Sequence, residues 1–234
     1  MGGLGWVSKR IRFPRYFPLM NAIAGRRALR EQIVALLQAG DFPALAALAG
    51  KEAGVAGQLM NFLFDPTSLL HWRAVEGMGY VAAAQPEQVR KHINRLLWQL
   101  NEDSGSFGWL AAAALGEIAR RHLPLVEEIL PMFYGFLQNP FARMTMLWGL
   151  GRLWEVRPQA LDEAIPLVFD FLKDPDPRMR GLAAWCLGRV KPPGLAEALS
   201  GLVEDDGPVE LYDRGQLGRT TVGSLAREAL GSRD

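Results

Sequence analysis

One sequence pattern recurs along the chain and constrains its fold more than any other feature. It is clearest in the segment DPDPRMRGLAAWCLGRV at residues 174–190, and related segments cover residues 65–81, 102–118 and 139–153. A shorter copy, TTVGSLAREALGS, closes the chain. Aligned on the glycine that follows the last Met or Leu, the copies are 37, 35, 37 and 43 residues apart. A period of this length is typical of proteins built from stacked repeats.

Each repeat is predicted to contain two helices. Between the aligned segments lie further apolar patterns at helical spacing, at residues 124–137 and 158–172. Pro131 and Pro166 each lie fifteen residues after an aligned glycine, inside these patterns, and we expect them to kink the first helix of their units. Three residues that favour N-cap positions each precede a proline suited to the first helical turn: Asp65, Asn139 and Asp174.

The segment at 174–190 resembles HEAT repeats, and most closely the short HEAT-like repeats also found in phycobilin lyases. Their consensus runs Asp-Pro, three variable residues, Val-Arg, then Ala-Ala-x-Ala-Leu-Gly. Arg180 takes the place of the consensus arginine and Arg143 matches it too, whereas His71, Gly108 and Gly223 depart from it. The resemblance implies a ladder of aspartates and arginines that is broken at both ends, with the members Asp65, Arg143, Asp174 and Arg180.

The resemblance, which covers residues 60–231, implies an all-α fold. We expect a right-handed α-α superhelix of five to six helical pairs, with one continuous repeat domain over residues 26–234. Two helical patterns, RRALREQIVALLQ and DFPALAALA, are interpreted as a degenerate first unit.

Both ends of the chain differ from the regular repeats. Residues 1–25 are interpreted as an irregular basic arm that caps the first repeat, or alternatively as a site for an acidic partner, nucleic acid or a membrane surface. Residues 1–30 carry seven basic side chains and no acid, while the chain from Ala196 onward has a net charge of −4. The insertion at 205–221 is predicted to form a short β-hairpin, which either covers the open end of the stack or acts as a binding finger.

No catalytic or metal-binding constellation is evident in the sequence. The three histidines lack the spacing of a zinc site, and Cys186 occupies a position held by glycine or alanine in the other repeats, which favours a buried thiol. One cysteine excludes an intramolecular disulfide. No stretch has the length of a membrane span, and no signal peptide is recognised, so a cytoplasmic protein is expected.

One stripe of the second helices is rich in aromatic residues. Positions seven and three before the aligned glycine and one after it lie on one helical face, and four of the seven tryptophans fall there. The resemblance places these helices on the concave surface, and we predict a partner-binding groove there; packing between neighbouring helices is the alternative interpretation. Arg152 and Arg189 are suited to a carboxylate or phosphate of the partner. The predicted partner-binding residues are Trp72, Glu76, Tyr80, Trp109, Trp148, Arg152, Trp185 and Arg189.

These features favour a bacterial-type, non-enzymatic scaffold that binds a peptide or protein segment in a tryptophan-lined groove, without a cofactor. The main alternative is a cofactor lyase or chaperone in which the same tryptophans hold a flat tetrapyrrole. Nucleic-acid binding is a further alternative, but it requires a basic groove, and the arginines outside the arm are mixed with acids. The oligomeric state is not indicated by the sequence.

Overall fold

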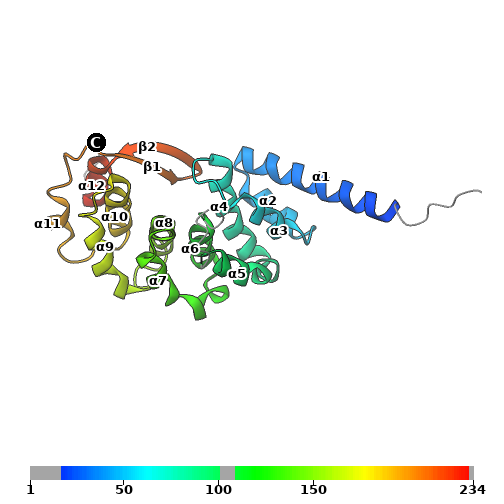
Figure 1. Cartoon of the computed structure of the whole chain (residues 1–234), viewed down its shortest axis with the longest axis horizontal. Helices are drawn as coiled ribbons and strands as arrows, with labels where there is room; N and C mark the ends of the chain where they lie inside the picture. Colours follow the sequence, from blue (N-terminus) through cyan, green and yellow to red (C-terminus); the bar gives the residue numbers. More distant parts are fainter. Residues whose placement is uncertain (1–16, 101–108, 232–234) are drawn as a thin grey trace, which may run out of the picture.

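The computed structural model describes residues 17–100 and 109–231, which form a stack of paired helices with one β-hairpin (Figure 1). Twelve α-helices in these residues make six consecutive pairs, and the second helix of each pair packs on the second helix of the next. We call these second helices the inner row: α2 (Phe42–Ala49), α4 (Leu69–Ala84), α6 (Ala111–His122), α8 (Arg143–Trp154), α10 (Pro177–Val190) and α12 (Val222–Leu230). The first helices are α1 (Phe17–Ala39), α3 (Val55–Leu59), α5 (Pro86–Leu100), α7 (Met132–Gln138), α9 (Ile165–Phe171) and α11 (Leu195–Leu199). Short 3₁₀ helices are η1 (Met60–Phe62), η2 (Leu123–Leu125), η3 (Glu127–Ile129) and η4 (Asp162–Ala164).

The insertion in the last repeat forms an antiparallel hairpin of β1 (Pro208–Asp213) and β2 (Gln216–Thr221). Its two loop residues, Arg214 and Gly215, have φ angles of 48° and 77°, as a two-residue turn between twisted strands requires. The hairpin does not extend into solvent. It runs from α10 and α12 along the inner row to α4, and so links the two halves of the stack (Figure 1).

The N-cap prediction was wrong in position. The carboxylate of Asp174 accepts a hydrogen bond from the Asp176 amide, and Asp176 is the N-cap of α10, with Pro177 as the first helical residue. Asn139 likewise accepts from the amide two residues on, four residues before α8 begins. Asp65 makes the same bond to Thr67. All three side chains therefore stabilise a turn ahead of the helix, because Asp and Asn readily bond to the amide two residues later.

The expected kinks at two prolines are also absent from the helices. Pro131 is the N-cap of α7, and Pro166 lies in the first turn of α9. The segment before each proline is a short 3₁₀ helix, η3 or η4. The prolines begin helices here because the first turn has no partner for a backbone N–H in any case.

Helix α1 includes residues 17–25, which the sequence pattern assigned to an irregular arm; residues 1–16 lie outside the described residues. The helix projects from the end of the stack (Figure 1). From Ile23 to Gln32, every side chain except the half-buried Leu29 is exposed. Residues 23–28 of α1 therefore do not cover the first repeat.

Glycines allow the inner helices to approach closely. Gly116 of α6 lies directly against the backbone of Gly149 in α8, and a methyl group at Gly116 would overlap that backbone. Gly135, on the exposed face of α7, has nothing within 4 Å of the position of a methyl group. These two sites provide a matched comparison.

Gly116→Ala is expected to lower the free energy of unfolding by about 1–3 kcal/mol, because two backbones must separate to admit the methyl group. Gly135→Ala is expected to raise it by about 0.5–1 kcal/mol through the helix preference of alanine. Urea denaturation of both variants checks this. Equal effects of the two substitutions would contradict the close approach of α6 and α8.

Over residues 17–100 and 109–231, no helix combines the length and the apolar character needed to cross a membrane.

Candidate functional site

The predicted tryptophan stripe lies in the inner row, but most of it is covered. The indoles of Trp72, Trp148 and Trp185 are 7%, 1% and 1% exposed. Trp109, in the turn before α6, is 44% exposed. The hairpin contributes part of this cover, so the packing role that the sequence left open accounts for the three buried indoles in the present structure.

Tyr212 of β1 is the centre of the contact between the hairpin and the inner row. Its ring stacks on Trp72 with centroids 5.6 Å apart and an interplanar angle of 9°. The indole N–H of Trp148 donates to the backbone carbonyl of Tyr212 at 2.8 Å, and the Tyr212 hydroxyl donates to Glu76 Oε2 at 2.7 Å. Burial raises the pKa of Tyr212, and the Glu76 carboxylate raises it further, so the phenol is a neutral donor.

A second set of bonds holds the hairpin tip. Arg73 of α4 donates from Nε to the carbonyl of Gly215 at 3.0 Å. Its guanidinium also donates to the carbonyls of Leu37 and Gln38 at the end of α1. Neither Arg73 nor Tyr212 was predicted as a site residue. The alternating pattern predicted the hairpin strands but did not indicate where the hairpin lies on the stack.

Charged residues form a buried cluster beside the aromatic contact. Arg152 of α8 lies 3.1 Å from Glu117 of α6, 3.7 Å from Glu76 of α4 and 3.8 Å from Asp213 of the hairpin. It also pairs with Glu155 at 3.1 Å. Burial alone would lower the pKa of Arg152, but the surrounding carboxylates outweigh this and raise it. Arg152, which the sequence assigned to a partner's carboxylate or phosphate, is paired within the chain.

The cluster continues along the inner row in both directions. Arg121 of α6 bonds to Glu117 at 2.9 Å, and its guanidinium lies 3.5 Å from the ring centroid of Tyr80. Arg189 of α10 lies 3.7 Å from Glu155 and 4.5 Å from the ring centroid of Trp185. The second of the two stripe arginines is therefore also paired internally.

The ladder implied by the resemblance is not formed by its predicted aspartates: of its members, Arg180 makes an ion pair, but with Asp205, which the prediction did not include. Arg180 donates to the carboxylate of Asp205, in the next repeat, at 2.9 Å, and to the backbone carbonyl of Asp174. The carboxylates of Asp174 and Asp65 instead bond within their own turns. Arg143 is half-buried at the start of α8.

The described residues of the inner row offer few side chains suited to catalysis or metal binding. No group of three or more His, Cys, Asp or Glu side chains suited to a metal ion occurs within the described residues. Cys186 of α10 is fully buried, and desolvation raises the pKa of its thiol well above the usual value. His71 is buried against the ring of Phe64, with centroids 4.5 Å apart.

Cys186 is expected not to react with a disulfide reagent in the native protein. The raised pKa keeps the thiol protonated at about pH 8, close to the pKa of an unfolded cysteine, and burial blocks access. Labelling should be complete in urea. Ser200→Cys, at an exposed position, is the control and should give one rapidly labelled thiol. Rapid labelling of the unmodified chain without denaturant would contradict the buried position.

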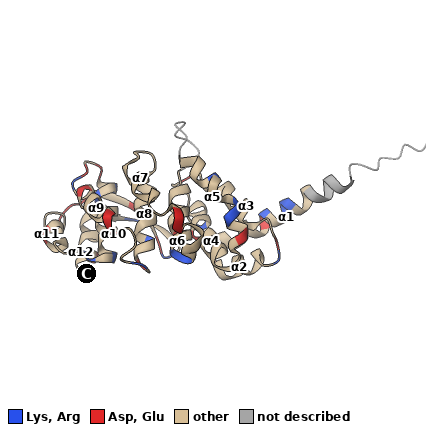
Figure 2. Cartoon of the chain, turned by 90° about the horizontal axis from the view of Figure 1, so that it is seen from below, with Lys and Arg blue, Asp and Glu red and all other residues tan. Residues whose placement is uncertain are grey.

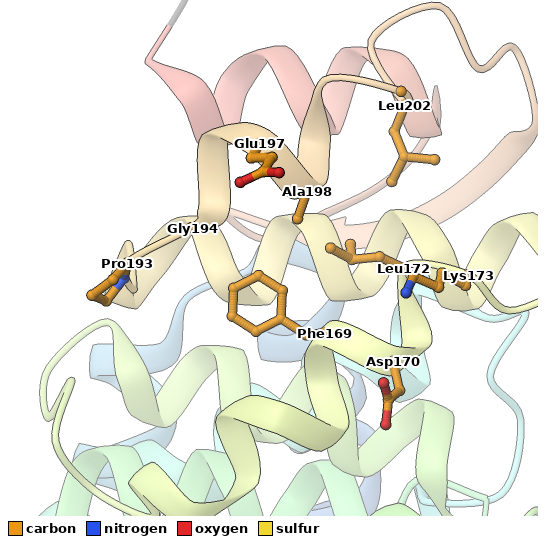
Figure 3. A pocket seen from close by; sticks show the side chains of 10 residues that line it. Phe169, Asp170, Leu172, Lys173, Pro193, Gly194, Glu197, Ala198 and Leu202 are labelled. Atoms are coloured by element: carbon orange, nitrogen blue, oxygen red, sulfur yellow. The ribbon is translucent and has the colours of Figure 1, made fainter.

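The described residues line several hollows, and two of these lie beside the last repeats. A cavity of 140 Å³ lies beside Tyr212, between the hairpin and the inner row, with Trp72, Trp148, Leu182 and Leu217 in its wall. A larger and more open groove of 490 Å³ lies between α9 and α11 on the other side of the repeats (Figure 3). Only the first touches the predicted stripe.

Comparison with known proteins agrees with the helical architecture. Residues 136–211 match the family model for HEAT repeats. An uncharacterised protein of Archaeoglobus fulgidus is 25% identical over 173 residues, which cover 73% of this chain and 93% of that protein. The match covers 76 of the 234 residues, and together with the stacked helical pairs it confirms the predicted resemblance to HEAT repeats.

Proposed function

We propose that this protein is a non-enzymatic interaction scaffold that binds an extended peptide or protein segment along its inner row. HEAT repeats generally mediate protein interactions. The observation that carries the proposal is that the inner row already holds an extended segment, its own hairpin. The proposal includes a right-handed superhelix, a repeat domain beginning near residue 26 and a cytoplasmic location.

The contacts under the hairpin are of the kinds that recognise polypeptides. Aromatic stacking, a side-chain bond to a backbone carbonyl and a buried charged group all converge on Tyr212 and Asp213. The predicted partner-binding residues Trp72, Glu76, Trp148 and Arg152 supply these contacts. Tyr80, Trp109 and Arg189 extend the proposed surface along the row, whereas Trp185 is buried against Gly151 of α8 and is not part of it.

The alternatives receive less support from the geometry. The cavity beside Tyr212, at 140 Å³, is smaller than ordinary ligand pockets of about 300–1,000 Å³, which disfavours a tetrapyrrole while the hairpin is in place. For nucleic acid, the two arginines of the stripe, Arg152 and Arg189, are already paired with carboxylates. Basic and acidic positions are interspersed along the stack (Figure 2).

A photo-cross-linking residue at an exposed glutamine tests the proposal. Gln216 lies at the hairpin tip beside the inner row, and Gln159 lies in the connection between α8 and α9. Irradiation in a lysate of the source organism should attach a partner from position 216 and not from position 159. Attachment only from position 159, equal attachment from both, or none from either would contradict binding along the inner row.

A further inference from the structure

The contacts of Tyr212 define a binding site with its own chemical preference. We call the residues around it the tyrosine slot: Trp72, Glu76, Trp148 and Arg152. Trp72 and Trp148 form an apolar corner, with their ring centroids 4.9 Å apart. Glu76 and Arg152 bring charge to the same corner, 3.7 Å from each other. The slot thus combines a flat aromatic wall with a carboxylate acceptor and a buried cation.

Each part of the Tyr-Asp dipeptide meets a different group of the slot. The ring stacks on Trp72, and the hydroxyl donates to the carboxylate of Glu76. The backbone carbonyl of Tyr212 accepts from Trp148. The carboxylate of Asp213 lies 3.8 Å from the guanidinium of Arg152. Side chain, backbone and following residue are therefore all contacted, as in a peptide-binding site.

This arrangement discriminates among related side chains. A phenylalanine would stack equally well but would leave an oxygen of the buried Glu76 without its hydroxyl donor. A phosphotyrosine would bring negative charge against that carboxylate. An asparagine after the tyrosine would lose the charge attraction to Arg152. The preferred ligand is an unmodified tyrosine followed by an acidic residue.

The hairpin can act as a competitor because it is held to the slot by contacts that a second segment can reproduce. We propose that the tyrosine slot recognises an extended partner segment with a tyrosine followed by aspartate or glutamate, and that the chain's own hairpin occupies the slot until such a segment displaces it. This inference rests on the proposed function and adds the partner's chemistry to it. Because the hairpin is part of the same chain, its high effective concentration weakens the apparent affinity of any partner.

A peptide competition on the full chain tests the inference. The probe is the acetylated, amidated peptide Pro-Val-Glu-Leu-Tyr-Asp, added to Tyr212→Ala and to the unmodified chain, with binding measured by calorimetry. The peptide should bind Tyr212→Ala at least about tenfold more tightly than the unmodified chain, because the hairpin of the variant no longer fills the slot. Tyr134→Ala, at a half-buried tyrosine of α7, is the matched control and should behave as the unmodified chain.

Altered peptides test the chemistry of the slot. Replacing the peptide tyrosine by phenylalanine should weaken binding to Tyr212→Ala by about tenfold or more, and alanine should abolish it. Replacing the aspartate by asparagine should weaken it several-fold. Equal binding of the tyrosine and alanine peptides, or equal binding to Tyr212→Ala and the unmodified chain, would overturn the inference. If Tyr212→Ala fails to fold, Tyr212→Phe takes its place with the same criteria, since it keeps the ring and loses only the bond to Glu76.

A random-peptide phage library, selected on the same variant, separates this inference from the proposed function. Enrichment of sequences with tyrosine followed by an acid supports both. Enrichment of other sequences that compete with the hairpin peptide overturns the tyrosine preference and leaves the scaffold function in place. The absence of any enriched sequence counts against both.

Discussion

Trp148→Ala is expected to lower the free energy of unfolding by about 3–5 kcal/mol, the range for removal of a large buried aromatic side chain. Trp148 is 1% exposed and packs against the rings of both Trp72 and Tyr212. Its loss also removes the bond that anchors the Tyr212 carbonyl. The cavity would lie at the contact between hairpin and inner row, where two parts of the chain must shift together to close it. Urea denaturation measures the change.

Trp98→Ala is the control for this prediction. Trp98 lies on α5 and is 60% exposed, so its removal is expected to change the free energy of unfolding by less than about 0.5 kcal/mol. If Trp148→Ala were as mild as Trp98→Ala, the indole would be part of an open surface and the buried contact described above would be wrong.

Glu117→Ala is expected to destabilise the fold by about 3–5 kcal/mol, because it removes one of the two nearest carboxylates from the buried guanidinium of Arg152. The Glu117 side chain is fully buried and bonds to Arg152 at 3.1 Å and to Arg121 at 2.9 Å. Replacement of both members, as in Glu117→Leu with Arg152→Met, should restore much of the loss, since no unpaired charge remains inside. Thermal and urea denaturation of the single and double variants measure this coupling.

An exposed ion pair provides the comparison. Glu31 and Arg27 on α1 are 2.9 Å apart with both side chains mostly in solvent. Glu31→Ala is expected to cost less than about 1 kcal/mol. A similar small cost for Glu117→Ala, or a double variant as unstable as the two single losses added together, would contradict the buried, coupled cluster.

The repeat architecture could be predicted because it depends on the spacing of residues that are close in the sequence. Four of the five aligned glycines lie where inner helices meet closely, as Gly116 does against Gly149, whereas Gly231 ends α12 as its C-cap. Helical periodicity between the aligned glycines marks the paired helices. The cap positions were misplaced by two or three residues because Asp and Asn stabilise turns as well as helix starts. The kinks predicted at Pro131 and Pro166 were wrong because a proline in a helical pattern can either begin a helix or kink it.

The position of the hairpin could not be predicted from local spacing. The strands followed from the alternation around Val209 and Leu211, yet Tyr212 meets Glu76 across 136 residues of sequence. A helical stripe of tryptophans has the same spacing whether it faces solvent or another segment of the chain. The spacing of Trp72 and Trp148 therefore did not indicate that the hairpin covers them. The arginines of the stripe were likewise assigned to a partner because most of their internal carboxylates lie on other helices; Glu155, three residues after Arg152, is the exception.

The most direct test of the account is whether the hairpin lies on the inner row in solution. Nuclear Overhauser effects can be recorded on protein labelled selectively in tyrosine and tryptophan. Cross-peaks from the ring protons of Tyr212 to the indoles of Trp72 and Trp148 are expected, and they should disappear in Tyr212→Ala, which assigns them. Their absence from the unmodified chain, with tryptophan emission typical of exposed indoles, would contradict the seated hairpin and the binding surface inferred from it.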